Sequence, residues 1–154
     1  MKYQHSETEN LKDEITHIES ETRMILPGVQ TLFGFQLVTV FNDRFAITLN
    51  YNEQVLHWGA IACSAVSAIL VISPAAYHRL AEPHTASRRF THFSNLWLKS
   101  SLFPLALGCV IDFFLIGIVI TKNYVVSGIV SAFLFIGFIT AWYIFPLLIR
   151  RKLP

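Results

Sequence analysis

The sequence predicts an all-α membrane protein: a bundle of four transmembrane helices with an amphipathic N-terminal helix on the cytoplasmic side. Hydrophobic residues make up 53% of the 154 residues, and charged residues only 14%. A soluble domain has about 45–50% apolar and about 25% charged residues. The mean hydropathy is +0.49, and the apolar surplus is collected into long runs, which is the pattern of membrane-spanning helices.

Four apolar runs are long enough to cross a hydrocarbon core about 30 Å thick, which takes roughly 20 helical residues. They cover about 24–41, 55–76, 101–121 and 125–149. The chain therefore divides into an acidic, amphipathic cytoplasmic segment, a transmembrane domain and a short basic cytoplasmic tail. These three parts are residues 1–22, 23–149 and 150–154.

Apolar residues recur at helical spacing before the first predicted span, at Leu11, Ile15, Ile18 and Ile25, with acids between them. This pattern predicts an amphipathic helix on the cytoplasmic face. Because its charge is mainly negative, we expect it to pack on the basic loop of the protein rather than on anionic lipid. A frayed acidic tail is the alternative interpretation.

Lys and Arg residues gather on one side of the predicted spans. Only Arg44 and Lys122 fall on the other side. Cytoplasmic loops collect positive charge, so we expect both termini and the loop over 77–100 to face the cytoplasm.

Polar side chains inside the spans predict one layer just beyond the middle of the membrane. If the first and third spans enter near Met24 and Ser100, then Gln36 and Asp112 both lie about 18 Å in, at 1.5 Å per residue. The candidate residues of this polar layer are Asp112, Gln36, Gln30, Ser64, Ser67 and Thr140.

Asp112 is the most informative of these residues, because an acid near the bilayer centre costs a few kcal/mol and is normally turned inward, paired or protonated. The functional hypothesis is a proton- or cation-linked site. The structural alternative is a protonated Asp112 that is hydrogen-bonded to Gln36 and joins two helices. The sequence leaves both open.

The first span carries polar residues on two faces. Arg23, Pro27, Gln30 and Gly34 fall in one stripe at 100° per residue, and Gln36 points almost the opposite way. A helix with amides on both faces is expected to be enclosed by protein on both. We therefore expect a tight bundle or a contact with another subunit, and the short chain favours a homo-oligomer.

A charged rim is expected where the first and second spans meet the cytoplasm. Its members are Glu21, Arg23, Tyr77, His78 and Arg79. An ion network that anchors helix ends is one interpretation of this cytoplasmic rim. A gate, or a pH sensor that acts through His78, is the other.

Several function classes are not expected. His78, His84 and His92 share a loop without metal-ligand spacing, and His57 is expected at the opposite membrane face. No nucleophile motif, phosphate loop or carboxylate pair appears, so we expect no metal, no cofactor and no enzymatic activity. The net charge of +2 and the lack of a basic–aromatic cluster argue against nucleic acid.

Two segments carry a resemblance to a known family. They are ETRMILPGVQTLFGFQLVTVFNDRF over 21–45 and SPAAYHRLAEP over 73–83. Within them the motifs E-T-R-x-x-L-P-G-x-Q-x-L-F-G-F-Q and P-x-A-Y-H-R resemble an uncharacterised family of small bacterial four-span membrane proteins, a domain of unknown function. The resemblance implies a multi-pass protein of the bacterial plasma (inner) membrane, and it brings no substrate or catalytic residues.

Two functions compete at this point. The first is permeation or transport of a proton or small ion past Gln36 and Asp112 by a protein embedded in the lipid bilayer. The second is a non-catalytic membrane accessory or scaffold, in which the acidic N-terminal helix and the loop over 77–100 dock a membrane or cytoplasmic protein partner.

Overall fold

The computed structural model describes residues 2–81 and 87–150, with side chains from residue 13 onward, and every element in these ranges is helical. The elements are α1 (Lys2–Val40), α2 (Phe45–Thr48), α3 (Tyr51–Ala81), α4 (Arg88–Thr121), α5 (Tyr124–Ile139), the π-helix η1 (Thr140–Ile144) and α6 (Phe145–Arg150). The predicted all-α class is confirmed.

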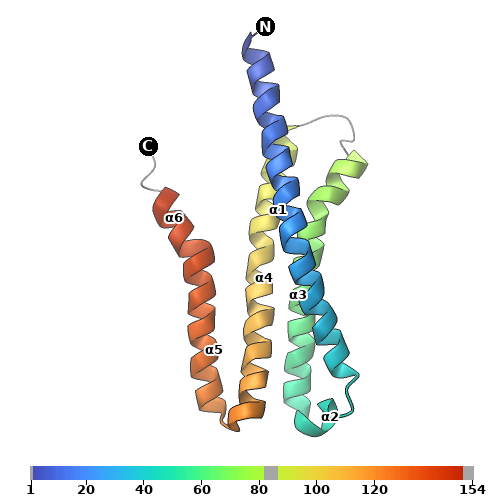
Figure 1. Cartoon of the computed structure of the whole chain (residues 1–154), viewed down its shortest axis with the longest axis vertical. Helices are drawn as coiled ribbons and strands as arrows, with labels where there is room; N and C mark the ends of the chain where they lie inside the picture. Colours follow the sequence, from blue (N-terminus) through green and yellow to red (C-terminus); the bar gives the residue numbers. More distant parts are fainter. Residues whose placement is uncertain (1, 82–86, 151–154) are drawn as a thin grey trace.

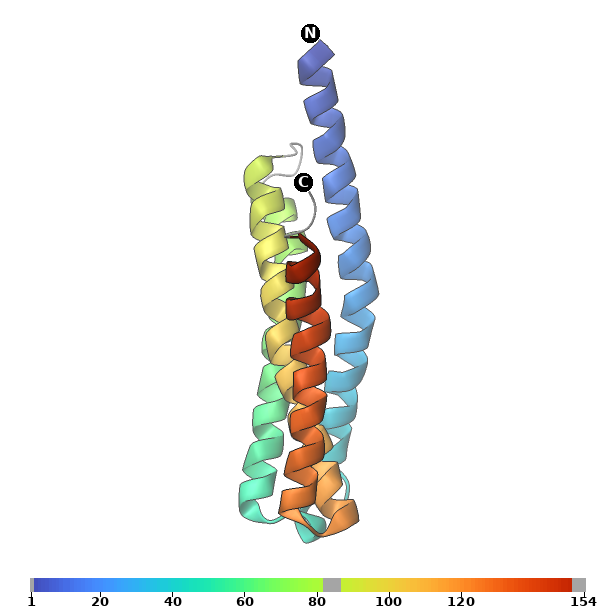
Figure 2. The same ribbon diagram turned by 90° about the vertical axis from the view of Figure 1, so that its left-hand side faces the viewer.

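The long helices run side by side along one axis (Figures 1 and 2). Both ends of the chain lie at one end of the bundle, and α2 and the α4–α5 turn lie at the other end. We call the end formed by residues 41–50 and 121–124 the distal end. Helices α1, α3 and α4 contact one another, whereas α5 packs on α4.

Three helical segments in the described part of the chain are long and apolar enough to cross a membrane. They are Tyr51–Ala81, Arg88–Thr121 and Tyr124–Arg150, the last combining α5, η1 and α6. Helix α1 is not among them, because its acidic first half is followed by an apolar half that Gln30 and Gln36 interrupt.

Helix α1 continues without a break through the predicted boundary between residues 22 and 23. Its 39 residues span about 58 Å at 1.5 Å per residue, nearly twice the hydrocarbon thickness. The expected separate N-terminal helix is therefore the first part of α1. Ile18 of this part is buried in a core with Val71 and Leu98, so this stretch packs on α3 and α4.

Side-chain caps fix the distal ends of the helices. Asn50 and Glu53 form a reciprocal capping box at the start of α3: Asn50 Oδ1 accepts from Glu53 N at 3.1 Å, and Glu53 Oε2 accepts from Asn50 N at 2.8 Å. In the α4–α5 turn, Lys122 has a φ of 54°. Asn123 then caps α5, because its Oδ1 accepts from the main-chain N–H groups of Val125 and Val126.

Small and hydroxylated residues let α3 and α4 approach closely, in what we call the seam. A Cβ at Gly108 would lie 3.2 Å from both the carbonyl oxygen of Ala60 and the Oγ of Ser64. Further along, Ser67 Oγ donates to the carbonyl oxygen of Ser101 at 2.9 Å. This small-residue contact is the type expected between helices in lipid.

The segment of α5, η1 and α6, which we call the C-terminal arm, diverges from the other helices toward the end that carries the termini (Figure 1). In η1 the Phe145 N–H reaches back to the carbonyl oxygen of Thr140. Pro146 follows immediately and has no N–H of its own. The π-helix therefore lies where the proline interrupts the regular ladder.

Candidate functional site

Three helices bring polar side chains together at Asp112 of α4. Gln36 Nε2 of α1 donates to Asp112 Oδ2 at 2.6 Å. His57 Nδ1 of α3 lies 3.1 Å from Asp112 Oδ1, and His57 Nε2 lies 3.1 Å from the main-chain oxygen of Gln36. We call Gln36, His57 and Asp112 the polar cluster.

The partners of His57 determine its tautomer. A main-chain carbonyl only accepts, so Nε2 carries a hydrogen and donates it to the oxygen of Gln36. The hydrogen between Nδ1 and Asp112 Oδ1 then belongs either to the imidazole, giving an ion pair, or to the carboxyl group, giving two neutral groups. Because Gln36 Nε2 donates to Oδ2 in both states, the cluster holds one exchangeable proton without rearranging its other bonds.

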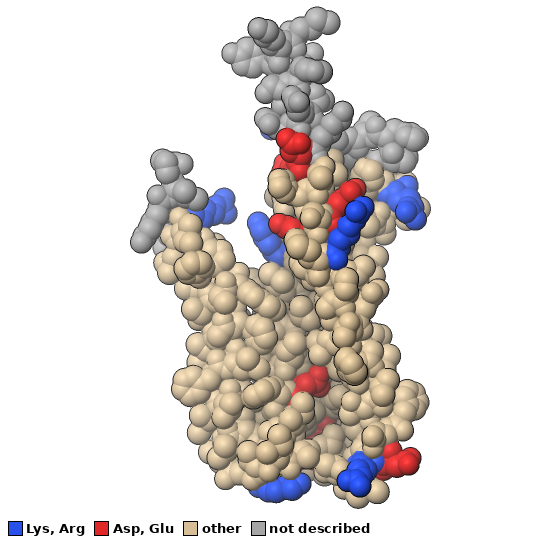
Figure 3. Space-filling model, in the orientation of Figure 1, with Lys and Arg blue, Asp and Glu red and all other residues tan. Residues whose placement is uncertain are grey.

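Burial raises the free-energy cost of leaving either His57 or Asp112 charged without its partner. Gln36 is 3% exposed and His57 6%, while the Asp112 side chain is 16% exposed. The Phe45 ring covers His57 with a centroid distance of 5.4 Å. A charge among such neighbours is expensive unless it is paired, so His57 and Asp112 hold their proton as a unit. Figure 3 shows acidic atoms within the otherwise uncharged body, toward the distal end.

One cluster atom lacks a hydrogen-bond partner in the described part of the chain. This atom is Gln36 Oε1, which is buried and accepts no hydrogen bond from the described residues. Buried acceptors are nearly always satisfied by protein or by ordered water. This oxygen is therefore an acceptor in the cluster that remains open to a hydrogen bond from water.

The helix positions explain why these residues meet. The carbonyl oxygen of Gln36 lies in the last turn of α1, which ends at Val40, and the partial negative charge of a helix C-terminus favours a cation nearby. His57 lies about 9 Å along α3 from Tyr51, and Asp112 lies about 14 Å from the distal end of α4 at Thr121. The polar cluster therefore lies in the distal part of the bundle.

The remaining residues of the predicted layer are spread over several levels. Ser64 is buried against Gly108, one turn from Asp112. Ser67 bonds Ser101 further along the seam. Gln30 is exposed on the surface of α1.

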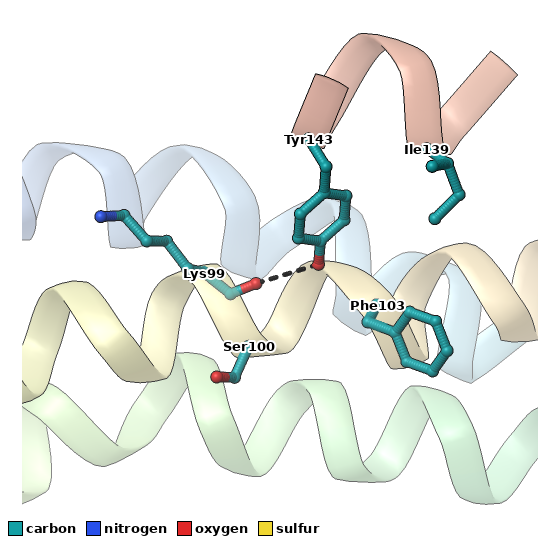
Figure 4. Close-up of a pocket in the computed structure, with 5 residues that line it drawn as sticks. All are labelled: Lys99, Ser100, Phe103, Ile139 and Tyr143. Atoms are coloured by element: carbon teal, nitrogen blue, oxygen red, sulfur yellow. Dashed lines mark hydrogen bonds between the residues drawn. The ribbon is translucent and has the colours of Figure 1, made fainter. Parts of the chain in front are cut away.

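Thr140 is exposed and far from the polar cluster. Its neighbours Ile139 and Tyr143 line a cavity of about 460 Å³ together with Lys99, Ser100 and Phe103 of α4. Figure 4 shows the Tyr143 hydroxyl directed at the carbonyl oxygen of Lys99, to which it donates at 3.2 Å. Phe103 lies about 14 Å along α4 from Asp112 at 1.5 Å per residue, so Thr140 does not share the level of Asp112.

The predicted cytoplasmic rim is held largely by aromatic packing. The Tyr77 ring stacks on Phe90 at 6.1 Å, and the His78 ring lies tilted on Phe90 at 5.1 Å. Arg23 approaches Glu19, one turn earlier on α1, at 4.0 Å. Glu21 and Arg79 are exposed.

His57 is the cluster residue that the sequence interpretation missed. It was expected at the membrane face because the second span was predicted to begin at residue 55, whereas α3 begins at Tyr51. A signal was available in the spacing: Glu53, His57, Ser64 and Ser67 follow one another on one helix face. All four are buried. Within the described ranges, no three or more His, Cys, Asp or Glu residues come together as a metal site requires.

Comparison with known proteins places most of the chain in one family. The model of a family of unknown function (DUF6328) matches residues 4–146. No curated protein matches the chain, and no solved structure matches it either.

Proposed function

We propose that this chain, which belongs to a family of unknown function (DUF6328), moves protons across a bacterial plasma membrane. The proposal is based on the residues of the polar cluster. In this proposal the protein is non-enzymatic, spans the membrane four times with both termini in the cytoplasm, and carries the proton on His57 and Asp112.

The fourth span of this proposal is the second half of α1. Three other segments are long and apolar enough to cross a membrane, and α1 contacts α3 and α4. Gln36, one of the two glutamines that interrupt its apolar half, is buried and partnered. Basic side chains gather near the end that carries the termini (Figure 3), which supports a cytoplasmic position for that end.

The observation that carries the proposal is the 3.1 Å contact between His57 Nδ1 and Asp112 Oδ1. If the shared proton leaves, two acceptors face each other at this distance, and the buried carboxylate loses a partner. The deprotonated state therefore requires a water or another cation to enter. A buried site that binds and releases a proton, and that admits water or another cation when the proton leaves, has the basic property of a transport site.

The replacement of Asp112 tests this function. Asp112→Asn keeps an oxygen to accept from Gln36 but removes the ionisable carboxyl group, so we expect proton flux to be abolished in liposomes that contain the purified protein. The measurement is the decay of an imposed pH gradient, read by an entrapped pH-sensitive dye.

Asp43→Asn is the matched control, because Asp43 is an exposed acid in the loop at the distal end and its replacement should leave the flux unchanged. Monodisperse elution of both variants from a sizing column shows that they remain folded. Wild-type flux in Asp112→Asn would contradict the proposed function.

We also propose a homo-oligomer. Gln30 places an uncovered amide on the apolar half of α1, and a second copy could bond that amide across a helix–helix contact. A bundle of four helices has little interior of its own for a path, so the oligomer would also enclose more of the route.

A further inference from the structure

A cleft opens at the distal end, immediately beside the polar cluster. It has a volume of about 380 Å³ and lies between the beginning of α3, the last turns of α4 and the beginning of α5. Its lining residues are Asn50, Asn52, Glu53, Leu56, Phe114 and Tyr124.

Glu53 connects the distal cleft with the polar cluster. Two other lining residues, Leu56 and Phe114, are near His57 and Asp112 in the sequence but project in other directions from their helices. Glu53 lies one helical turn before His57 on the same face of α3, and both residues are buried. A path from the cleft to the imidazole therefore crosses about one helical turn.

Glu53 is held in place by partners from two directions. The Tyr124 hydroxyl donates to Oε1 at 2.7 Å, and the Asn50 main-chain N–H donates to Oε2 at 2.8 Å. Asn50 Nδ2 in turn approaches the Tyr124 oxygen at 3.3 Å. The carboxyl group faces neutral donors from α5 and from the α3 cap, while His57 and Asp112 are the titratable groups on its inner side.

We propose that this cleft is the entry through which protons from the distal side reach His57 and Asp112, with Glu53 as the relay carboxyl group. This inference rests on the proposed function. The Glu53 carboxylate takes a proton from hydronium at the distal side, which leaves water, and releases that proton through water in the cleft to the neutral imidazole and carboxylate of His57 and Asp112, so that Glu53 returns to its charged form. The unpartnered Gln36 Oε1 is the acceptor available to such a water at the inner end.

The relay is tested with Glu53→Gln. The amide keeps both contacts, because its oxygen accepts from Asn50 N and its NH₂ donates to the Tyr124 oxygen, but it cannot carry a proton. We expect proton flux in liposomes to fall about a hundredfold, the lower end of the range for the loss of a positioned proton-transfer group.

Tyr124→Phe is the matched control for Glu53→Gln. It removes the contact between α3 and α5 but leaves the carboxyl group, so it should reduce flux less than Glu53→Gln does. Normal flux in Glu53→Gln together with reduced flux in Tyr124→Phe would show that Glu53 acts only as a structural tie, and this would overturn the relay.

The cleft itself is tested by cysteine accessibility in a background in which Cys63 and Cys109 are replaced by alanine. Leu56→Cys places a thiol in the cleft, whereas Val55→Cys places one at almost the same depth on the exposed apolar surface of α3. A charged, membrane-impermeant thiosulfonate added from the distal side should modify Leu56→Cys much faster. Equal rates at the two positions would overturn the hydrated entry.

These outcomes separate the entry from the proposed function. Loss of flux in Asp112→Asn with normal flux in Glu53→Gln would overturn the entry alone. Normal flux in Asp112→Asn would overturn the function, and with it the role of Glu53 in supplying that site.

Discussion

The seam between α3 and α4 differs from the uncovered surfaces of the molecule in the way polar groups are used. In α3, 28% of the most apolar 18-residue stretch is buried within the chain, against 0% in the C-terminal arm. The seam encloses Ser64, Ser67, Ser101 and Gly108 and ends distally at His57 and Asp112. The arm has only Ser127 and Ser131 buried among its described residues.

This difference shows which pair of helices is held in one defined packing arrangement by its own side chains. In lipid there is little hydrophobic force between helices, so close approach and interhelical hydrogen bonds determine which faces meet. The seam has both, and the cluster at its distal end adds α1 through Gln36. In the arm, a comparably close approach lies near the turn, where a Cβ at Gly117 would lie 3.0 Å from Ser127 Oγ. Further along, Tyr143 adds one hydrogen bond to the carbonyl oxygen of Lys99.

The largest effect is expected from breaking the seam at the polar cluster. His57→Leu leaves the Asp112 carboxyl group buried with only Gln36 as partner, so we expect the free energy of unfolding to fall by about 3–5 kcal/mol, the cost of removing one member of a buried pair. The measurement is unfolding in mixed micelles of mild detergent and dodecyl sulfate.

The double variant His57→Leu with Asp112→Leu supplies the control for this prediction. Replacement of both partners by apolar residues should recover much of the lost stability, because no uncompensated polar group remains. Equal or greater loss in the double variant would mean that packing, rather than the pair, accounts for the effect.

A smaller effect is expected where the seam relies on small residues. Gly108→Ala brings a methyl group to 3.2 Å from the main-chain oxygen of Ala60, which cannot move without shifting α3. We expect a loss of about 1–3 kcal/mol, the usual cost of overpacking, measured by the same unfolding titration.

Gly137→Ala in the arm sharpens this comparison, because a Cβ at Gly137 meets nothing within 4 Å. It should be neutral, or should gain up to about 1 kcal/mol from the better helix propensity of alanine. If the two glycine variants lost equal stability, the seam and the arm would not differ in the way described above.

The sequence predicted the helical class, three segments that are long and apolar enough to cross a membrane, and the meeting of Gln36 with Asp112, because these depend on hydropathy and on rise per residue. It missed His57 because helix boundaries are not fixed by apolar runs: the Asn50–Glu53 capping box starts α3 at Tyr51, which lengthens the helix and carries His57 inward. The heights of Ser64, Ser67 and Thr140 depend on how neighbouring helices are shifted relative to one another, and this shift is set by side-chain contacts that no single segment encodes.

The smallest effect on the stability of one chain is expected at Gln30, which contrasts with Gln36 on the same helix. Gln36 is buried and bonded to Asp112, whereas Gln30 is exposed. Gln30→Leu should therefore change the free energy of unfolding of the monomer by less than about 0.5 kcal/mol, as is usual for surface sites.

If a second copy covers this face, the same variant should dissociate the oligomer, because an interhelical amide contact is lost. Light scattering of the detergent-solubilised protein measures the mass, and Thr140→Val, on the exposed surface of the arm, is the control. Unchanged mass in Gln30→Leu would mean that lipid or water meets this amide, and that the uncovered face of α1 is not a subunit contact.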